Sequence, residues 1–504
     1  MGMVLNTNIP SIQAQRALGE SRKEMEIAME RLSTGSRINS AGDDAAGLAI
    51  VERMNSQIRG LGQATRNAND GIALIKTVEN ALVEVSGMLQ RMRELAVQAS
   101  NDTNTSTERA FADNEVTSLQ KEISRISLNT RYNGAQVLNG SFAAKSLQVG
   151  TEAGETLDFS IGNVEASKLG AYIVDGLTQS AIAGGSSSDT DYNNGVADAD
   201  VQITSFGTTR TIDVEQYDTA KTIAKKINAV AASTQVVAST AAYAWLYSPT
   251  ANPTQSGVGA VQARLKFIDS TGAATETAAF TLTSNDVSDA IQKINAISSS
   301  TGVHASSTGD YKVLLSEKNG NNITIINTSA RTDLDVKAVG IDGITADSTE
   351  VSLGAASSTS SVDTAVVRGN LKLSSNNDFT INQQTAAEFF SNGEQSAPLV
   401  NVGTISVLTR IKASDSLAII DGAIETVSSM RGSLGSLQNR LDYTVSNLLK
   451  VTEFTTAARS RIADADFAAE TARLAKAQVL QQAGASMLSQ ANASTDTVLQ
   501  LLRG

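Results

Sequence analysis

The feature that most constrains this 504-residue chain is a seven-residue apolar repeat found at both ends of the sequence. One repeat runs through residues 54–96 and the other through residues 420–448. A heptad repeat kept in one phase holds one apolar stripe of a helix against a partner helix. The two segments are therefore predicted to pack on each other as long helices. The N-terminal stripe consists of Met54, Leu61, Ala68, Ile75, Leu82, Leu89 and Ala96, with Val78, Val85, Met92 and Ala99 beside them; the C-terminal stripe consists of Ile420, Val427, Leu434, Leu441 and Leu448.

The outermost segments carry a much weaker apolar pattern. Residues 1–44 and 465–504 space their apolar side chains as helices do, but most of these side chains are small. Such helices are marginal alone in water, and polar residues in a seam lower pair stability while fixing register. Both segments are predicted to fold when many copies assemble. Their seam positions are Leu18, Met25 and Leu32 at one end, and Phe467, Leu474, Ala477, Gln481, Gly484, Leu488, Ala491, Thr495, Val498 and Leu502 at the other.

Between the two ends the pattern predicts shorter elements. Residues 44–100 are expected to form one helix of roughly 80 Å, at ~1.5 Å per residue. A polar turn and a third helix, with Val116 and Ile123 on its apolar face, are expected to follow. Two Asn-Gly dipeptides predict a hairpin within residues 131–142. Residues 156–162 alternate as a strand does.

The middle of the chain contains an internal repeat. Residues 223–239 match residues 290–306 without a gap, and nine of the 17 positions are identical. Each copy is flanked by β-prone runs, which predicts a strand–helix–strand unit present twice. Residues 313–327 and 370–381 are predicted to form hairpins.

Together these patterns predict a mixed fold. A long antiparallel α-helical coiled-coil rod is expected from the two termini, with β-rich or α+β outer domains inserted in the middle. The expected divisions are a terminal helical segment at 1–44, a helical rod with a β-hairpin region at 45–179, outer domains at 180–405 with repeats near 207–243 and 278–327, a C-terminal rod helix at 406–464 and a second terminal helical segment at 465–504.

Composition and residue types exclude several function classes. The net charge of −12 argues against a nucleic-acid partner, and no run approaches the roughly 18 apolar residues of a membrane span. The chain has no cysteine and one histidine, His304, which excludes the usual zinc and Cys-His arrangements. His304 is predicted to be a strand-face residue. Asp43, Asp44, Asp464 and Asp466 are predicted to cap helices. We expect no enzyme activity, cofactor or metal.

Several segments taken together resemble bacterial flagellins. They include NTNIPSIQAQRAL near the start, RLSTGSRINSAGDDAAGLAI at 31–50, TRNANDGIALIKTVENAL at 65–82, LQRMRELAVQASN at 89–101 and, at the far end, QVLQQAGASMLSQAN and VLQLLRG. The resemblance covers about residues 1–142 and 412–504. It implies a structural subunit that self-assembles into the flagellar filament used for swimming motility, with ends that order on assembly.

The resemblance also implies partners and a location. The expected partners are further copies of the chain, the flagellar cap and hook-filament junction proteins, and an export chaperone at the C-terminal helices. The expected location is extracellular, in the flagellum, after export by the flagellar type III pathway without a cleaved signal peptide. Subunit packing is assigned to Ile75, Leu82, Leu89, Met92, Leu434, Leu441, Leu448, Leu474, Leu488 and Leu502.

Innate immune receptors are further implied partners. Arg91, Leu95, Gln98 and Glu115 match flagellin positions that engage Toll-like receptor 5, although the same residues also suit a subunit-packing face. Val498, Leu499, Leu501 and Leu502 match the end sensed by cytosolic inflammasome receptors. Serine and threonine residues at 186–188 and 357–361 are candidates for O-glycosylation, with a solvated loop as the simpler interpretation.

Two alternatives remain open at this point. A hook-filament junction protein would share the helical ends and would be a minor component of the filament. A secreted adhesin or enzyme carried on a flagellin frame would need a ligand site in the middle of the chain. Abundance in sheared filaments separates the first alternative from a major subunit.

Overall fold

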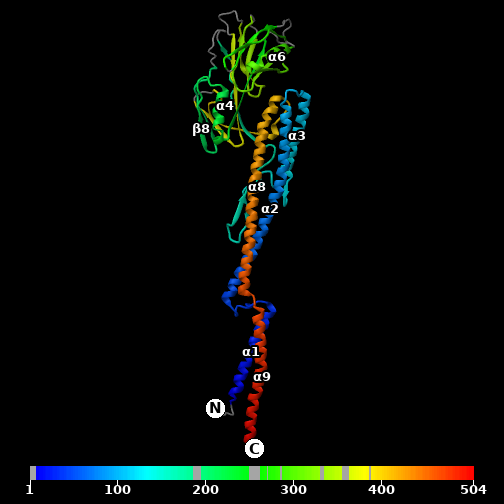
Figure 1. Cartoon of the computed structure of the whole chain (residues 1–504), viewed down its shortest axis with the longest axis vertical. Coiled ribbons are helices and arrows are strands. Elements are labelled where there is room, and N and C mark those ends of the chain that lie inside the picture. Colours follow the sequence, from blue (N-terminus) through cyan, green and yellow to red (C-terminus); the bar gives the residue numbers. More distant parts are fainter. Residues whose placement is uncertain are drawn as a thin grey trace. The chain divides into compact units, whose positions relative to one another are not determined.

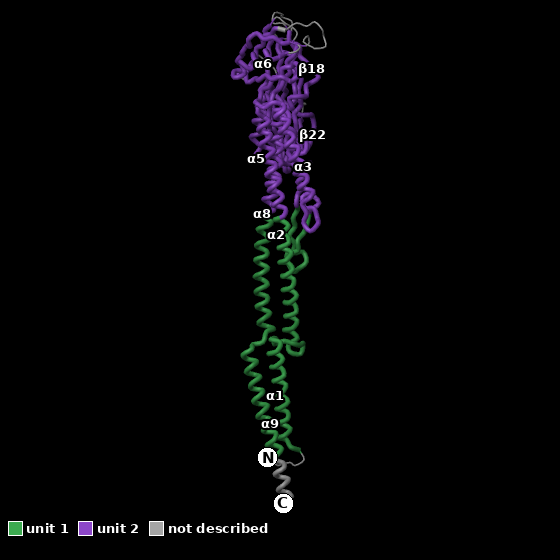
Figure 2. The backbone as a smooth tube through the Cα atoms, turned by 90° about the vertical axis from the view of Figure 1, so that its right-hand side faces the viewer, with its two compact units in different colours: residues 1–76, 144–160, 435–504 green, residues 77–143, 161–434 purple. Residues whose placement is uncertain are grey.

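The computed structural model describes residues 7–184, 194–248, 261–269, 271–283, 286–329, 334–354, 363–384 and 388–503. Its contacts divide the chain into two units, shown in different colours in Figure 2. The first unit comprises residues 1–76, 144–160 and 435–504, and the second comprises residues 77–143 and 161–434. The proposed O-glycosylation segments at 186–188 and 357–361 lie outside the described residues.

The first unit is built from antiparallel helix pairs. Helix α1 (Ile9–Thr34) lies beside α9 (Phe467–Arg503), as Figure 1 shows. The beginning of α2 (Ala45–Ala99) packs on the end of α8 (Arg410–Ala463), where Leu61, Ala64 and Leu448 form a buried cluster. A hairpin of β3 (Lys145–Gln148) and β4 (Thr156–Phe159) completes the unit.

A glycine lets this hairpin approach the helices. A Cβ atom on Gly71 of α2 would lie 2.6 Å from Leu147 Cδ2 and 3.3 Å from Leu441 Cδ1. The first distance is shorter than carbon atoms tolerate, so a larger side chain would push Leu147 away. Gly71 therefore permits strand β3 and helix α8 to contact α2 at one level.

The helical part of the second unit contains the rest of α2, the beginning of α8 and helix α3 (Ser106–Asn129). Its apolar stripe is fully buried: Leu82, Leu89 and Met92 have no exposed surface. Ion pairs flank the stripe, with Glu79 Oε1 2.8 Å from Arg431 Nε and Asp421 Oδ1 2.6 Å from Arg93 Nε. From the first ion pair to the second, the residue number rises along α2 and falls along α8. The two helices therefore run in opposite directions, and the predicted antiparallel pairing is confirmed.

The β-rich part of the second unit contains three larger sheets of antiparallel strands. Two short antiparallel pairs accompany them, and one of these is the hairpin predicted at Asn133-Gly134. The eight-stranded sheet contains β14 (Val303–Ser307), β15 (Val313–Glu317), β9 (Val237–Tyr247), β20 (Asn370–Ser375), β5 (Gly170–Asp175) and β23 (Leu399–Asn401), with β17 (Leu334–Val339) also on β9 and β18 (Ala346–Leu353) on β17; the five-stranded sheet contains β12 (Ala274–Glu276), β11 (Leu265–Ile268), β16 (Ile323–Asn327), β19 (Thr364–Val367) and β6 (Ile182–Gly184); the four-stranded sheet contains β22 (Gly393–Ser396), β21 (Phe379–Gln383), β7 (Val201–Ser205) and β8 (Thr208–Ile212); the short pairs are β1 (Arg131–Tyr132) with β2 (Ala135–Gln136) and β10 (Val261–Ala263) with β13 (Phe280–Leu282).

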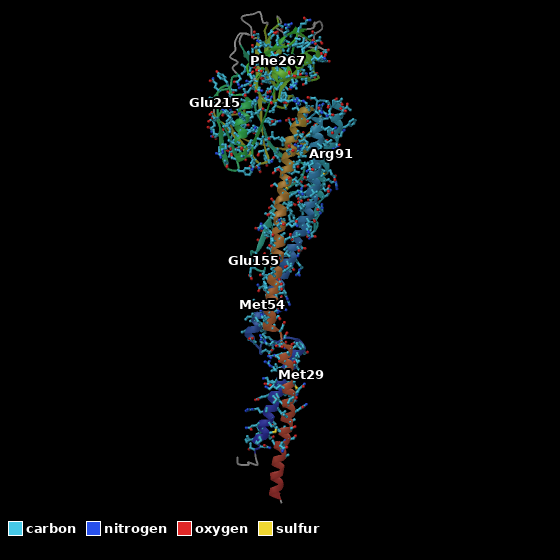
Figure 3. All side chains as sticks on the ribbon, viewed as in Figure 1. Met29, Met54, Arg91, Glu155, Glu215 and Phe267 are labelled. Atoms are coloured by element: carbon cyan, nitrogen blue, oxygen red, sulfur yellow. The ribbon has the colours of Figure 1, made fainter. Side chains whose placement is uncertain are left out.

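Two apolar cores stabilise this part. One core lies between the eight-stranded and five-stranded sheets and includes Phe267, labelled in Figure 3. Helix α6 (Ser288–Asn295) closes it with Ile294. The other core lies under helix α4 (Ala220–Ala229) and includes Ile203 and Ile227. Strand β9 contributes to both cores, because Ala238 belongs to one and Ala244 to the other.

The internal repeat is confirmed in structural detail. The Asn228 side chain of α4 accepts a hydrogen bond from the Ala238 N–H (2.8 Å) and donates one to the Ala238 carbonyl (2.9 Å). Asn295 of α6 makes the same two bonds to Ala305, at 2.8 and 2.9 Å. One asparagine in each copy thus holds the helix to the strand that follows. The short helices α5 (Ala231–Thr234) and α7 (Ser298–Thr301) lie between them in each copy.

Both predicted hairpins of the middle region are wrong. The strands exist, but β15 pairs with β14 and β9, whereas β16 pairs with β11 and β19 in the other sheet. Likewise β20 pairs with β9 and β5, and β21 with β7 and β22. The physical reason is burial, because every residue of β15 and β16 is buried. Neither strand alternates between buried and solvent-facing side chains, and each lies in a different sheet with its side chains in the core.

Two of the four predicted helix caps, Asp44 and Asp466, are confirmed, and the other two, Asp43 and Asp464, are wrong. Asp464 follows the end of α8, where its N–H donates to the Ser460 carbonyl. Asp44 Oδ1 accepts the Gly47 N–H (2.8 Å) before α2, and Asp466 Oδ1 accepts the Ala468 N–H (2.9 Å) at the start of α9. Asp43 instead accepts the Ser40 N–H at 2.8 Å, and this bond holds the pKa of its carboxyl below the usual value. Thr105 and Glu108 form a reciprocal capping box at the start of α3.

Replacing either repeat asparagine should destabilise the β-rich part by a similar amount. Asn228→Ala and Asn295→Ala each remove two side-chain hydrogen bonds to a strand and leave partly buried backbone groups unpaired. We expect each to lower the free energy of unfolding by about 1–3 kcal/mol. Urea unfolding of the full chain measures this, with the exposed Asn114→Ala on α3 as control. Unchanged stability in both variants would mean that these bonds do not hold the repeat together.

Acid should loosen the start of α3. The Thr105 N–H (2.7 Å) and hydroxyl donate to Glu108 and lower the pKa of its carboxyl. The cap's contribution is therefore present above the unfolded-state pKa and is lost as pH falls through the lower, folded-state value. We expect amide protection at residues 106–109 to fall with acid in the wild type. In Glu108→Gln it should start lower and vary less, and identical profiles would contradict the assignment.

Candidate assembly surface

Helices α1 and α9 meet through small and polar side chains over most of their length. At one end, Asn8 Nδ2 donates to the Ala491 carbonyl (3.1 Å) and Ser11 Oγ to Asn492 Oδ1 (3.0 Å). Asn8 also caps α1 by accepting the Ser11 N–H at 3.0 Å. Near the middle, a Cβ atom on Gly484 would lie 3.0 Å from Leu18, so this glycine allows close approach.

At the other end the two helices are joined by backbone hydrogen bonds. Gly35 ends α1 in the left-handed conformation, with φ of 70°, which favours glycine. Its carbonyl accepts the Ala465 N–H at 2.9 Å, and the Arg37 N–H donates to the Ala463 carbonyl at 2.6 Å. These bonds fix the chain where it leaves α1 against the link between α8 and α9.

A buried ion pair lies beside this junction. Arg31 Nη1 of α1 is 3.2 Å from Glu470 Oε1 of α9, and Arg473 Nη1 is 2.9 Å from the same oxygen. Glu470 is only 4% exposed. Removing Arg31 would leave the buried Glu470 carboxylate with Arg473 of its own helix alone, so the contact favours one alignment of α1 with α9.

Large apolar side chains are left uncovered on both helices. Met29, labelled in Figure 3, is 53% exposed and Val479 is 64% exposed. Among the described residues of the pair, only Ser11, Ala28, Glu470 and Ala477 are buried. A pair with so small a core and so many exposed apolar groups presents a surface that another helix can cover. The exposed large apolar residues of the two helices are Ile9, Ile12, Met29, Phe467, Val479, Leu480 and Met487.

The residues assigned to subunit packing fall into three groups. Ile75 and Leu441 represent the first group, whose side chains are buried within this single chain. Leu474 and Leu488 are half-buried on α9, and the side chain of Leu502 lies outside the described part. The side chains of Val498, Leu499 and Leu501 lie outside it as well. The first group comprises Ile75, Leu82, Leu89, Met92, Leu434, Leu441 and Leu448.

Sequence reasoning placed Phe467 in the seam, although it is 59% exposed, and missed the other six exposed apolar residues. Heptad spacing selected the side of α9 that contains Leu474 and Gly484, and Gly484 lies close to Leu18 of α1, whereas Val479 and Met487 lie outside that stripe. The available signal was a surplus of apolar residues beyond a single stripe. Such a surplus indicates a helix with more than one apolar face.

The proposed receptor residues lie on two neighbouring helices. Arg91 Nε of α2, labelled in Figure 3, is 2.8 Å from Glu115 Oε1 of α3, and Glu115 raises the pKa of this guanidinium. Arg91, Gln98 and Glu115 are exposed. Leu95 is only 3% exposed, so it supports the others from below and offers almost no surface of its own.

The strand-face prediction for His304 is confirmed. His304 is an exposed residue of strand β14, opposite Ser316. Among the described residues, one trio of carboxylates, Asp198, Asp200 and Asp213, comes close enough to share a cation, and two of the three are exposed. None of the described helices has both the length and the apolar content of a membrane span.

Comparisons with known proteins agree with this geometry. Residues 5–143 match the bacterial flagellin N-terminal helical region, and residues 417–502 match the bacterial flagellin C-terminal helical region. The chain is 36% identical over 510 residues to the B-type flagellin of Pseudomonas aeruginosa, and 32% identical over 503 residues to flagellin B of Vibrio cholerae. Each alignment covers 100% of both proteins.

Two solved structures illustrate weaker likenesses. FliC from Burkholderia pseudomallei is 16% identical, with coverage of 73% of this chain and 99% of that one and a TM-score of 0.28. The flagellar junction protein FlgL from Legionella pneumophila is 11% identical, with coverage of 82% and 98% and a TM-score of 0.32. These superpositions are too loose to carry an argument. The full-length identity to flagellins does carry one: the chain belongs to the bacterial flagellin family and is a structural subunit of a flagellar filament.

Proposed function

We propose that this chain polymerises with copies of itself through its terminal helices to form the filament used for swimming. The observation that carries the proposal is the set of uncovered apolar side chains on α1 and α9, among them Val479 and Met487 at 64% exposure each. Covering such surface is favourable by about 25 cal/mol per Å² of apolar area. A second copy presenting the same helices supplies that cover, and head-to-tail repetition gives an open helical polymer.

The same pair explains how the ends order on assembly. With almost no large side chain fully buried between α1 and α9, the pair does not offset the conformational entropy that its backbone loses, about 1–2 kcal/mol per residue. Neighbouring copies add the missing burial. In this proposal Leu474, Leu488 and Leu502 pack within the assembled core, while the fully buried stripe of Leu82 and Leu441 keeps each subunit stiff.

One charge on the exposed apolar face should block polymerisation. Val479→Glu places a carboxylate at a position that is open in the single chain and covered in the polymer, where an unpaired charge is costly. We expect the critical concentration for seeded assembly to rise by about tenfold or more, since tenfold corresponds to only about 1.4 kcal/mol. Sedimentation and electron microscopy measure it.

Two further variants make this test specific. Gln478→Glu adds the same charge at the preceding exposed position and should assemble nearly as the wild type does. A chain lacking residues 465–504 should fold in its second unit and form no filaments. Normal filaments from that truncated chain, or from Val479→Glu at the wild-type concentration, would refute the terminal-helix mechanism.

Family membership supports a proposal about export and about partners at the ends of the filament. We propose that the chain leaves the cell by the flagellar type III pathway. We further propose that an export chaperone covers the exposed apolar face of α9 before assembly. The flagellar cap and hook-filament junction proteins are proposed to contact the two ends of the polymer through the same helices.

Recognition of the single subunit by innate immune receptors is a second proposal. The observation that favours it is the accessible ion pair of Arg91 with Glu115, next to exposed Gln98, on the adjoining surfaces of α2 and α3. Arginine is common among residues that dominate binding energy, because its guanidinium offers several donors on a stackable plane. We assign this surface to Toll-like receptor 5, and the end containing Val498 and Leu502 to cytosolic receptors.

Replacing Arg91 should weaken receptor signalling selectively. We expect Arg91→Ala monomers to need about tenfold more protein for half-maximal activation of cells that express Toll-like receptor 5. Arg93→Ala is the matched control, since Arg93 is equally exposed but pairs with Asp421 on another side of the helix. Equal potency of Arg91→Ala and the wild type would rule this surface out.

A further inference from the structure

One strand of the eight-stranded sheet concentrates the aromatic residues of a chain that has few. Aromatic residues make up 4% of the sequence, and Trp245 is the single tryptophan. Tyr243, Trp245 and Tyr247 occupy alternate positions of strand β9 and therefore share one face of the sheet. Tyr243 is buried beside Leu314 and Val339, whereas Trp245 and Tyr247 are half-buried.

Charged side chains surround these rings. Lys312 Nζ lies 4.2 Å from the centroid of Trp245 and 5.7 Å from that of Tyr247. The Tyr247 hydroxyl donates to Glu350 at 2.5 Å, and Lys337 Nζ lies 3.2 Å from the same carboxylate. Because Lys337 pairs directly with Trp245 across the sheet, both side chains belong to this face. The face thus combines flat apolar rings with hydrogen-bonding groups at their edges.

A cavity of about 340 Å³ adjoins Tyr243 where the sheet meets the beginning of α8. Its cationic lining residues are Lys318, Lys372 and Arg410, against a single lining carboxylate, Asp415. Lys372 Nζ is 2.8 Å from Asp415 Oδ1, and Arg410 Nε is 3.1 Å from Asp102 Oδ1. Lys318 is exposed and takes part in no ion pair among the described residues. Lys372 Nζ is also 3.6 Å from Asp175 Oδ1, so the charges of Lys372 and Arg410 are offset and Lys318 supplies the cavity's uncompensated positive charge.

The rest of the lining suits a ligand rich in hydroxyl groups. Ser239, Thr240 and Ser414 contribute side-chain hydroxyls, and Ile341 and Ile411 contribute a small apolar surface. Pockets that hold small molecules measure about 300–1,000 Å³ and orient their ligands with a few polar groups. A sugar that carries a carboxylate fits this combination of cations, hydroxyls and apolar surface.

We propose that this part of the second unit binds an acidic oligosaccharide. The carboxylate of one sugar enters the cavity beside Lys318, and the next sugar lies at the edge of Trp245, beside the Lys312 ammonium that covers the ring face. Charge complementarity selects an acidic chain over a neutral one.

The single tryptophan makes the proposal directly measurable. Full-length monomer would be titrated with a tetrasaccharide of alternating glucuronic acid and N-acetylglucosamine, followed by tryptophan fluorescence and calorimetry. We expect saturable binding with a change in Trp245 emission, and none with the neutral tetrasaccharide of N-acetylglucosamine. Lys318→Ala should weaken binding by about tenfold, as expected for a lost charge-assisted contact.

Matched variants separate this site from general electrostatics and from misfolding. Lys225→Ala removes an exposed lysine of α4 outside the cavity and should leave the affinity unchanged. Trp245→Phe keeps a ring and should retain weaker binding by calorimetry, with wild-type circular dichroism. Equal binding of the neutral sugar, indifference to Lys318→Ala or no saturable binding would each overturn the proposal. Polymerisation of Lys318→Ala should remain normal, so this result is independent of the assembly mechanism.

Discussion

The antiparallel apolar seam between α2 and α8 is the contact on which the rest of the structure depends. It joins two segments separated by the whole β-rich region, and in the second unit it leaves Leu82, Leu89 and Val427 without exposed surface. The flanking pairs, Arg431 with Glu79 and Arg93 with Asp421, favour one register because a shift by a turn would separate both. Once this seam forms, the chain between the helices is a closed loop. Loop-closure entropy rises by only about 0.6 kcal/mol for each doubling of loop length, so the seam tolerates a large insertion.

Helices α1 and α9 continue the antiparallel arrangement with the opposite balance of burial. The seam of α2 and α8 buries Leu, Ile, Val and Met, whereas α1 and α9 bury Ala28, Ala477 and a polar pair. The specificity of the outer pair comes from Arg31 with Glu470 and from the backbone bonds near Gly35. Buried ion pairs specify alignment more than they add stability. The outer helices therefore have a defined partner within the chain and too little buried surface to depend on that partner alone.

Local signals predicted much of this fold, and long-range pairing did not follow from them. Heptad spacing placed α2 and α8, Asp44 and Asp466 marked helix starts, and the repeated Asn228 and Asn295 marked two related units. The strands at 313–317 and 323–327 were found but wrongly paired, because a fully apolar run does not reveal which sheet holds it. Glu317 hints at the true geometry: its buried carboxylate accepts the Asn319 and Asn321 N–H groups, folding the loop inward as the chain crosses between sheets. The exposed apolar face of α9 was missed because the heptad pattern identifies one apolar stripe, whereas α9 has a second one that includes Val479 and Met487.

The duplicated unit shows which of its residues the fold requires. Thr234 and Thr301 make equivalent hydrogen bonds, accepting the Val236 and Val303 N–H groups at 3.3 Å, just before the strand held by the asparagine. Between them lies a residue in the left-handed conformation, which is Gly302 with φ of 73° in one copy and Gln235 with φ of 54° in the other. A side chain in this conformation costs roughly 1–2 kcal/mol, and the surrounding hydrogen bonds hold it there. The backbone path is thus determined by the threonine and the asparagine rather than by the glycine. Val237 in one copy and His304 in the other occupy the equivalent position, and both side chains are exposed to solvent. Neither is needed to hold the backbone path, so an apolar and an ionisable side chain can stand at the same place in the two units.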